Sequence, residues 1–230
     1  MQYLRYYCTE NLIINSQFKI SVGVSQRIDS IEGRYELHDA IDQKLLKFLL
    51  EAGFLPVTIP NILFETKTTN NLANSVFESW LEKQSLGALV LSGGNNIGDF
   101  PQRDCTEQYL LSWAESNDIP LLGICRGMQM MATWAGAELK PAKGHVRTQH
   151  QLLLSNSNSQ WPRSVNSYHD WSLLNCPEKF EVAAKAEDGN IEAICHKTLP
   201  WEGWMWHPER EQPFDSADTM RVKRLFNEKK

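Results

Sequence analysis

Short apolar runs alternate with amphipathic segments over the first 140 residues, and this alternation constrains the fold more than any other feature of the chain. The strand-like runs are continuously apolar, as is typical of strands covered on both faces. The segments between them place apolar residues three and four positions apart, as at Leu45, Phe48 and Leu49. We therefore predict an α/β fold with a mostly parallel central sheet. The expected strands are 19–26, 55–60, 87–94 and 119–124, and the expected helices are 39–54, 75–84, 104–118 and 126–135.

Two capping patterns mark the ends of these helices. Asp39 is predicted to cap the first helix, and Gly53 to end it. Gly136 is predicted to end the helix that follows Cys125, whereas residues 27–36 are predicted to form a polar loop.

The pattern changes after Gly136, where short strand-like runs are separated by turn residues. The motif EDGN at 187–190 predicts a hairpin, so we expect antiparallel strands in the C-terminal half. The expected strands here are 150–156, 180–187, 191–196 and 203–207, followed by a closing helix within 211–230. Residues 1–18 are predicted to be an N-terminal extension and residues 19–230 a single domain, because no linker-like segment divides them.

Composition excludes several classes of function. The chain has 230 residues, a net charge of −5 and no basic cluster, which argues against nucleic-acid and membrane-surface partners. No apolar run approaches the ~18 residues of a membrane span. Five cysteines form no CxxC pair and the first residues lack a signal-peptide pattern, so we expect free thiols and a cytoplasmic location. The histidines and cysteines show no metal-ligand spacing, so neither a metal nor another cofactor is expected.

The segment LLGICRGMQ presents one cysteine in an unusual position. Gly123 and Gly127 flank Cys125 where an expected strand meets an expected helix, the pattern of a nucleophile elbow. The dipole of the following helix would favour a thiolate, and the backbone N–H of Arg126 would face an oxyanion. The alternative is a buried core thiol, the commonest fate of a lone cysteine.

A cysteine nucleophile needs a base and a second oxyanion donor. His207 follows a strand-like run, and Glu209 lies two residues later, close enough to fold back and orient the imidazole. Taken alone, this HPE motif more often marks a surface turn, and it indicates a base only together with the elbow at Cys125. The N–H of Gly94 or Asn95, after the run LSGG, is the expected second donor, with a simple glycine turn as the alternative.

Four segments in this order, LSGG, GICRGMQ, VNSYHDW and HPE, resemble the class I glutamine amidotransferase superfamily. The resemblance extends from about Lys19 to Arg210. It implies a flavodoxin-like α/β/α sandwich with a Cys-His-Glu triad made by Cys125, His207 and Glu209. It also implies glutamyl contacts by Gln129 and by the segment of Asn166, Ser167, Tyr168 and His169.

Two further segments, DAIDQKLLKFLLEAGFLPVTIPN and AEDGNIEAICHKTLPWEGWMWHPE, resemble the stand-alone γ-glutamyl hydrolases, the γ-glutamyl-γ-aminobutyrate hydrolase group. The WMWHPER ending is also similar to that of hydrolases acting on γ-glutamyl-CDP-amidate in bacterial capsule phosphoramidate synthesis. The implied function is cleavage of a small γ-glutamyl amide to glutamate and an amine, through a γ-glutamyl thioester. A glutaminase subunit that delivers ammonia to a separate synthase, and a catalytically silent binding relative, are the alternatives.

Three basic residues are candidates for contact with a substrate phosphate. Arg126 stands where the family more usually has a small or apolar residue, and His145 and Arg147 lie in a loop expected near the site. Solvated surface charge is the competing interpretation for all three.

Overall fold

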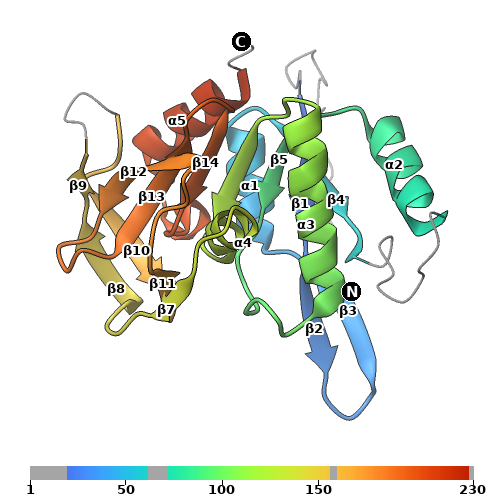
Figure 1. The fold of residues 1–230 in the computed structure, drawn as a ribbon, viewed down its shortest axis with the longest axis horizontal. Coiled ribbons are helices and arrows are strands. Elements are labelled where there is room, and N and C mark those ends of the chain that lie inside the picture. Colours follow the sequence, from blue (N-terminus) through green and yellow to red (C-terminus); the bar gives the residue numbers. More distant parts are fainter. Residues whose placement is uncertain (1–19, 62–71, 156–159, 228–230) are drawn as a thin grey trace, which may run out of the picture.

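The computed structural model describes residues 20–61, 72–155 and 160–227. An eight-stranded sheet forms the centre of this part of the chain (Figure 1). In spatial order its strands are β4 (Leu55–Ile59), β1 (Ser21–Ser25), β5 (Leu86–Leu91), β6 (Leu121–Ile124), β14 (Trp201–Trp204), β13 (Ile191–His196), β12 (Phe180–Lys185) and β9 (Leu153–Leu154). The first five strands are parallel and the last three continue the sheet in antiparallel pairs.

Helices cover both faces of this sheet (Figure 1). They are α1 (Gln43–Glu51), α2 (Leu72–Gln84), α3 (Pro101–Ser116), α4 (Arg126–Trp134) and α5 (Ser216–Asn227). One apolar cluster joins Phe48 of α1 and Val222 of α5 to Val24 of β1. The other joins Phe77 of α2 and Leu110 of α3 to the opposite face of the sheet. The predicted α/β/α sandwich, with antiparallel strands in its C-terminal half, is confirmed. No helix in the described ranges is long and apolar enough to cross a membrane.

The carboxyl ends of three adjacent parallel strands coincide. Leu91 at the end of β5 pairs with Gly123, and Ile124 at the end of β6 pairs with Trp204 at the end of β14. The segments that follow these strands therefore meet at one edge of the sheet, where open α/β sheets bind their ligands.

The predicted N-cap of the first helix is wrong. The N-cap is Asp42, whose side chain accepts a hydrogen bond from the N–H of Lys44 at 2.9 Å. Asp39 lies in a strand instead, and its carboxylate accepts from the N–H of Asn61. Gly53 and Gly136 follow the ends of α1 and α4 with positive φ, as predicted.

Residues 27–36 are not a loop. Arg27–Ile31 (β2) and Glu36–Ala40 (β3) form an antiparallel hairpin. Most of its side chains are exposed, so it has little of the apolar pattern from which a strand is predicted. Distant contacts stabilise it instead: the amide of Asn95 bonds both the N–H and the C=O of Ile28, at 2.9 and 3.0 Å.

The C-terminal half contains the predicted hairpin between β12 and β13 and the closing helix α5. The single strand predicted at 150–156 is wrong, because the chain bends there and divides it between two sheets. Its first two residues, His150 and Gln151, belong to β8 (Val146–Gln151), which pairs with β10 (Ser164–Tyr168), and Leu153 and Leu154 form β9. A further pair joins β7 (Leu139–Pro141) to β11 (Trp171–Leu173). The extension predicted at 1–18 lies outside the described residues.

Candidate active site

Cys125 occupies a strained turn between β6 and α4. Its φ of 50° and ψ of −106° are rarely adopted by a residue with a side chain, and such a conformation costs about 1–3 kcal/mol. The N–H of Cys125 donates to the carbonyl of Trp204 at 2.7 Å, which fixes the turn. A Cβ at Gly127 would overlap the carbonyl oxygen of Leu91, so only glycine lets α4 approach β5 this closely. Cys125 is the N-cap of the nine-residue α4, where the helix dipole favours a thiolate.

His207 follows β14 and lies beside Glu209. The Nδ1–H of His207 donates to Oε1 of Glu209 at 2.6 Å, and both side chains are buried. Pro208 starts a single 3-10 turn, Pro208–Arg210 (η2), which brings Glu209 back toward the imidazole. A Cβ at Gly93 would lie 2.6 Å from Cε1 of His207, so a glycine is needed where the imidazole packs against the β5 loop.

Two neighbouring charges set the protonation of His207. Burial alone would lower the pKa of His207. The charges of Cys125 and Glu209 outweigh this effect and raise the pKa from 6.5 to about 9. The side chain of His207 also hydrogen-bonds that of Cys125. At neutral pH the imidazole is therefore protonated, next to a cysteine placed to carry negative charge.

A cavity of about 240 Å³ opens over this pair. It brings together eight of the residues that the sequence singled out: Gly94, Asn95, Cys125, Arg126, Gln129, Tyr168, His169 and His207. Four segments, each at the end of a different strand, therefore contribute to one hollow beside a buried thiol. The geometry is suited to nucleophilic attack on a small bound substrate.

Asn166 and Ser167 do not line this cavity. The amide of Asn166 accepts from the N–H of His207 at 3.0 Å and donates to its C=O at 2.9 Å. Ser167 is buried and donates from Oγ to the carbonyl of His145 at 2.7 Å. Asn166 thus holds the backbone of His207 rather than reaching toward a substrate.

Gln129 connects the two sides of the cavity. Its Nε2 donates to the carbonyl of Trp171 at 3.0 Å, which ties α4 to the segment after β10. Tyr168 stacks edge-on against His207, with 6.0 Å between ring centroids.

Two charged residues of the cavity were not predicted. Asp170 is exposed on one side, and Arg210 lies with its Cζ 4.3 Å from the centre of the Tyr168 ring. Asp170 lies within the segment VNSYHDW and Arg210 directly follows HPE, and that position is the only signal in the sequence that would have found them.

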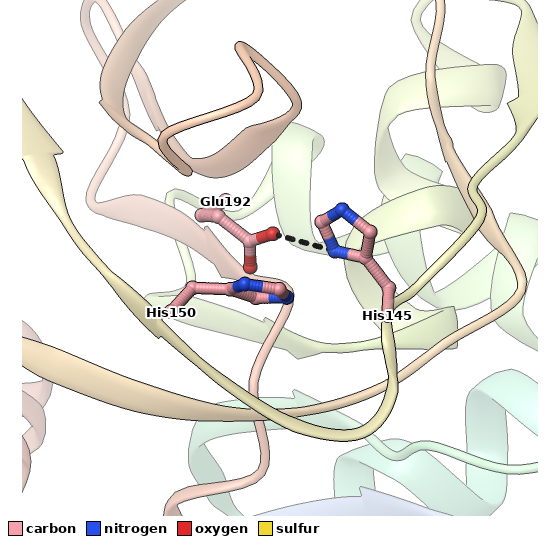
Figure 2. A group of neighbouring side chains, drawn as sticks. All are labelled: His145, His150 and Glu192. Carbon is pink, nitrogen blue, oxygen red and sulfur yellow. Dashed lines mark ion pairs between the residues drawn. The ribbon is translucent and has the colours of Figure 1, made fainter.

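His145 and Arg147 do not reach the cavity. His145 is buried and faces Glu192 (Figure 2), with 3.4 Å between Nδ1 and Oε1. Arg147 is exposed in β8. The proposed contact of these residues with a substrate phosphate therefore has no support in the fold.

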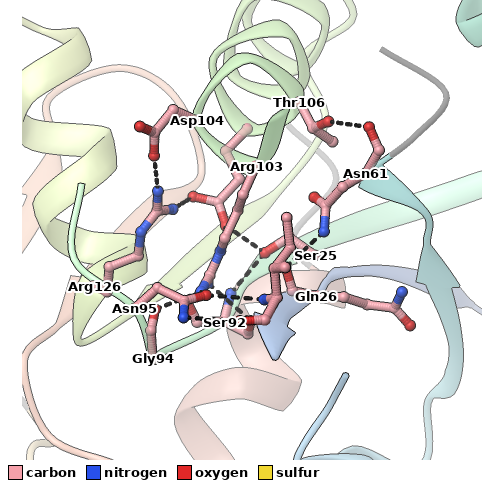
Figure 3. Close-up of polar contacts among 12 residues, drawn as sticks. Ser25, Gln26, Asn61, Ser92, Gly94, Asn95, Arg103, Asp104, Thr106 and Arg126 are labelled. Atoms are coloured by element: carbon pink, nitrogen blue, oxygen red, sulfur yellow. Dashed lines mark hydrogen bonds and ion pairs between the residues drawn. The ribbon is translucent and has the colours of Figure 1, made fainter. Parts of the chain in front are cut away.

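The Arg126 side chain faces neither solvent nor the cavity. It is buried and forms ion pairs with Asp104 and Glu107 of α3 (Figure 3). Burial and the nearby charge of Arg103 lower the pKa of Arg126 to about 9, so it stays charged at neutral pH. Only the backbone of Arg126 remains available as an oxyanion donor.

Arg103 fixes the loop that follows β5. Its guanidinium donates to the carbonyls of Ser92 at 2.7 Å, of Gly93 at 3.1 Å and of Gly94 (Figure 3). A trans peptide points its N–H opposite to its C=O. The N–H groups of Gly94 and Asn95 are therefore directed away from Arg103, and both residues line the cavity.

Comparisons with known proteins agree with this geometry. The family described as "Glutamine amidotransferase class-I" matches residues 36–220. The gamma-glutamyl-CDP-amidate hydrolase of Campylobacter jejuni is 30% identical over 145 residues, which cover 60% of this chain and 70% of that protein. A glutamine-hydrolyzing GMP synthase subunit of Methanothrix thermoacetophila is 32% identical over 129 residues, covering 52% and 68%.

Two more distant proteins match over a larger share of the chain. The gamma-glutamyl-gamma-aminobutyrate hydrolase of Escherichia coli is 24% identical over 201 residues, covering 74% of this chain and 78% of that protein. The crystal structure of a glutamine amidotransferase from Thermotoga maritima superposes with a TM-score of 0.63 at 15% identity, covering 91% and 99%. This last similarity supports the fold alone.

Proposed function

Since this chain belongs to the class I glutamine amidotransferase family, we propose that it is a cysteine hydrolase of small γ-glutamyl amides, producing glutamate and a free amine. The observation that carries this proposal is the placement of Cys125 in a strained elbow beside the buried His207–Glu209 pair. No other described part of the chain combines a nucleophile, an acid and an adjoining cavity.

The first step is acyl transfer to sulfur. The Cys125 thiolate attacks the δ-carbonyl carbon of the γ-glutamyl amide, and the C–O π electrons move to oxygen. The N–H groups of Arg126 and Gly94 stabilise that oxyanion, with Asn95 as the alternative second donor. Collapse breaks the C–N bond, and His207 gives its proton to the leaving amine.

The second step returns the enzyme to its starting state. Neutral His207 takes a proton from water, whose oxygen attacks the thioester carbonyl. Glutamate leaves, and the thiolate and imidazolium are restored. Glu209 orients the imidazole in both steps and stabilises its positive charge.

The charges of the cavity suit an amino-acid end group. Asp170 provides a negative charge for the α-ammonium group of the glutamyl moiety, and Arg210 a positive charge for its α-carboxylate. Gln129, Tyr168 and His169 complete the wall on that side. A substrate with a free glutamyl α-carbon end therefore fits better than a peptide glutamine.

The substrate that we favour is a nucleotide-linked γ-glutamyl amide, from which the nucleotide-linked amine leaves. The name of the Campylobacter jejuni relative supports it. Arg27 supports it as well, because it is partly exposed and lines a hollow that adjoins the cavity through Gly94 and Arg210. Arginine is well suited to a phosphate oxygen. The four described cysteines are free, which is consistent with the cytoplasmic location that we propose for this reaction.

A glutaminase subunit is the second candidate function, and the similarity to the Methanothrix thermoacetophila GMP synthase subunit favours it. Such a protein would act on free glutamine and would be stimulated by a synthase partner. The two candidates therefore differ in their preferred amide and in their dependence on a partner.

The test is an amine-release assay of the isolated chain on free glutamine, γ-glutamyl-aminobutyrate and γ-glutamyl-CDP-amidate. We expect turnover of at least one N-substituted amide well above that of glutamine, loss of turnover in Cys125→Ala, and normal turnover in the control Cys176→Ala. Preference for glutamine would favour the glutaminase subunit. Wild-type turnover in Cys125→Ala would overturn both candidates.

A further inference from the structure

Three histidines and one glutamate converge behind the wall of the active-site cavity. His145 directly precedes β8, His150 lies in β8, His169 follows β10 and Glu192 lies in β13. Figure 2 shows His145 and His150 directed at the carboxylate of Glu192. His145, His169 and Glu192 are at most 3% exposed, so the cluster is inside the protein.

The spacing of the donor atoms fits one metal ion. Nδ1 of His145 lies 3.2 Å from Nε2 of His169 and 3.4 Å from Oε1 of Glu192, and the last two atoms are 3.5 Å apart. Nitrogen and oxygen ligands of a tetrahedral Zn²⁺, bound at about 2.0–2.1 Å, lie about 3.3–3.4 Å from one another. The three atoms thus match one face of such a tetrahedron. A ligand atom of His150 lies within 4.8 Å of those of His145 and Glu192, and it can take the fourth corner of the tetrahedron after a shift toward them.

The outward-facing ring nitrogens have the partners that metal-bound histidines require. Nε2 of His145 lies 2.8 Å from the carboxylate of Asp188, and Nδ1 of His169 lies 2.9 Å from the carbonyl of Trp171. Nδ2 of Asn190, a donor, also lies 3.1 Å from Nε2 of His145. A hydrogen on Nε2 of His145 for Asp188 and on Nδ1 of His169 for Trp171 leaves lone pairs on the inward nitrogens.

Glu192 and His150 lack hydrogen bonds of their own on the inward side, whereas Nδ1 of His145 and Nε2 of His169 lie within hydrogen-bond distance of each other. Both carboxylate oxygens of Glu192 and Nε2 of His150 are without a hydrogen-bond partner among the described residues. A buried carboxylate without partners costs several kcal/mol unless a cation compensates it. One divalent ion compensates all four inward atoms together.

We propose that His145, His150, His169 and Glu192 bind one Zn²⁺ in a tetrahedral site of three nitrogens and one oxygen. Imidazole and carboxylate donors in this geometry select zinc over magnesium or calcium. Four protein ligands leave no position for water, so the ion is structural. Because His169 also lines the active-site cavity, the ion holds that wall in place.

The test uses tag-free Cys125→Ser, which removes the catalytic thiol as a competing zinc ligand. The protein is treated with a chelator, titrated with ZnCl₂ by calorimetry and analysed for metal content by mass spectrometry. We expect one Zn²⁺ per chain and a higher melting temperature with the ion bound. This variant needs no activity, so the result is independent of the proposed function.

Three further variants, each in the same background, make the test specific. Glu192→Gln is expected to lose the bound ion, and Asp188→Asn, at a half-exposed site, to bind it about 10–100-fold more weakly. The control His38→Gln changes an exposed histidine outside the cluster and is expected to bind zinc normally. A folded Asp188→Asn keeps the test decisive if Glu192→Gln fails to fold. Substoichiometric zinc in the Cys125→Ser protein, or unchanged affinity in Asp188→Asn, would overturn the proposal and leave the cluster as a protonated histidine–glutamate network.

Discussion

Arg126 turns its guanidinium away from the active-site cavity and pairs with Glu107 inside the protein. The same carboxylate accepts from Nε of Arg103 at 3.1 Å and from Oγ of Ser25 at 2.7 Å. Glu107 therefore joins the residue after the nucleophile to the arginine that orients the β5 loop. The two segments expected to bind the oxyanion are held by one buried carboxylate.

Glu107→Gln is expected to destabilise the protein strongly. The substitution leaves the buried guanidinium of Arg103 without its anion and that of Arg126 with Asp104 alone, and breaking such buried pairs costs about 3–5 kcal/mol. Urea unfolding measures this loss. Glu115→Gln is the matched control, because the exposed pair of Glu115 with Lys179 should contribute less than about 1 kcal/mol. Equal effects of the two substitutions would contradict the role assigned to Glu107.

Asn166→Ala distinguishes a positioning residue from a substrate contact. Because Asn166 bonds both backbone groups of His207, we expect kcat to fall about 10–100-fold while KM changes little. Steady-state kinetics on the best substrate of the panel provide both values. A rise in KM at unchanged kcat would instead support the glutamyl contact that the sequence predicted for Asn166.

The pKa of His207 should depend on Cys125. The charge of Cys125 is the largest influence raising this pKa above its ordinary value, so Cys125→Ala is expected to lower it from about 9. Titration of the imidazole by NMR measures the shift directly. In the wild type, kcat/KM should fall as the pH rises through about 9, since the leaving amine then loses its acid. An unchanged imidazole pKa in Cys125→Ala would show that the two groups do not interact.

Asp218 provides a test of stability against pH. Burial and the nearby charge of Asp215 raise the pKa of Asp218 from 3.8 to about 8, although its bond from Trp206 lowers it. A carboxyl whose pKa is raised on folding loses stability as the pH rises from the unfolded value through the folded one. Asp218→Asn should therefore gain about 1–3 kcal/mol over the wild type, with the difference growing from pH 4 to pH 8. Urea unfolding at several pH values checks this, and a difference independent of pH would contradict it.

Local patterns in the sequence predicted most of the framework. Continuous apolar runs predicted the parallel strands, and glycines marked the ends of α1 and α4 correctly. The β2–β3 hairpin was missed because its strands are largely exposed and are anchored by Asn95, 67 residues from Ile28. Pattern-based prediction detects burial and does not detect a single distant hydrogen-bonding side chain.

The candidate site was likewise predicted where local turns determine it and missed where distant contacts determine it. Cys125, His207 and Glu209 were singled out because backbone turns place them, and turns have local signals. The direction of the Arg126 side chain depends on Glu107, which lies on another helix, and so the sequence left it open. The histidine–glutamate cluster had no signal at all, because its members come from three separate segments, of which strand pairing joins only β8 and β10.

The central claim is that Cys125 forms a γ-glutamyl thioester. Rapid acid quenching of the wild-type enzyme during turnover of a γ-glutamyl amide, followed by mass spectrometry of its peptides, tests this most directly. We predict that the peptide containing Cys125 carries the added mass of one γ-glutamyl group and that Cys125→Ala carries none. An enzyme that releases amine at full rate while Cys125 stays unmodified at every quench time would contradict the account.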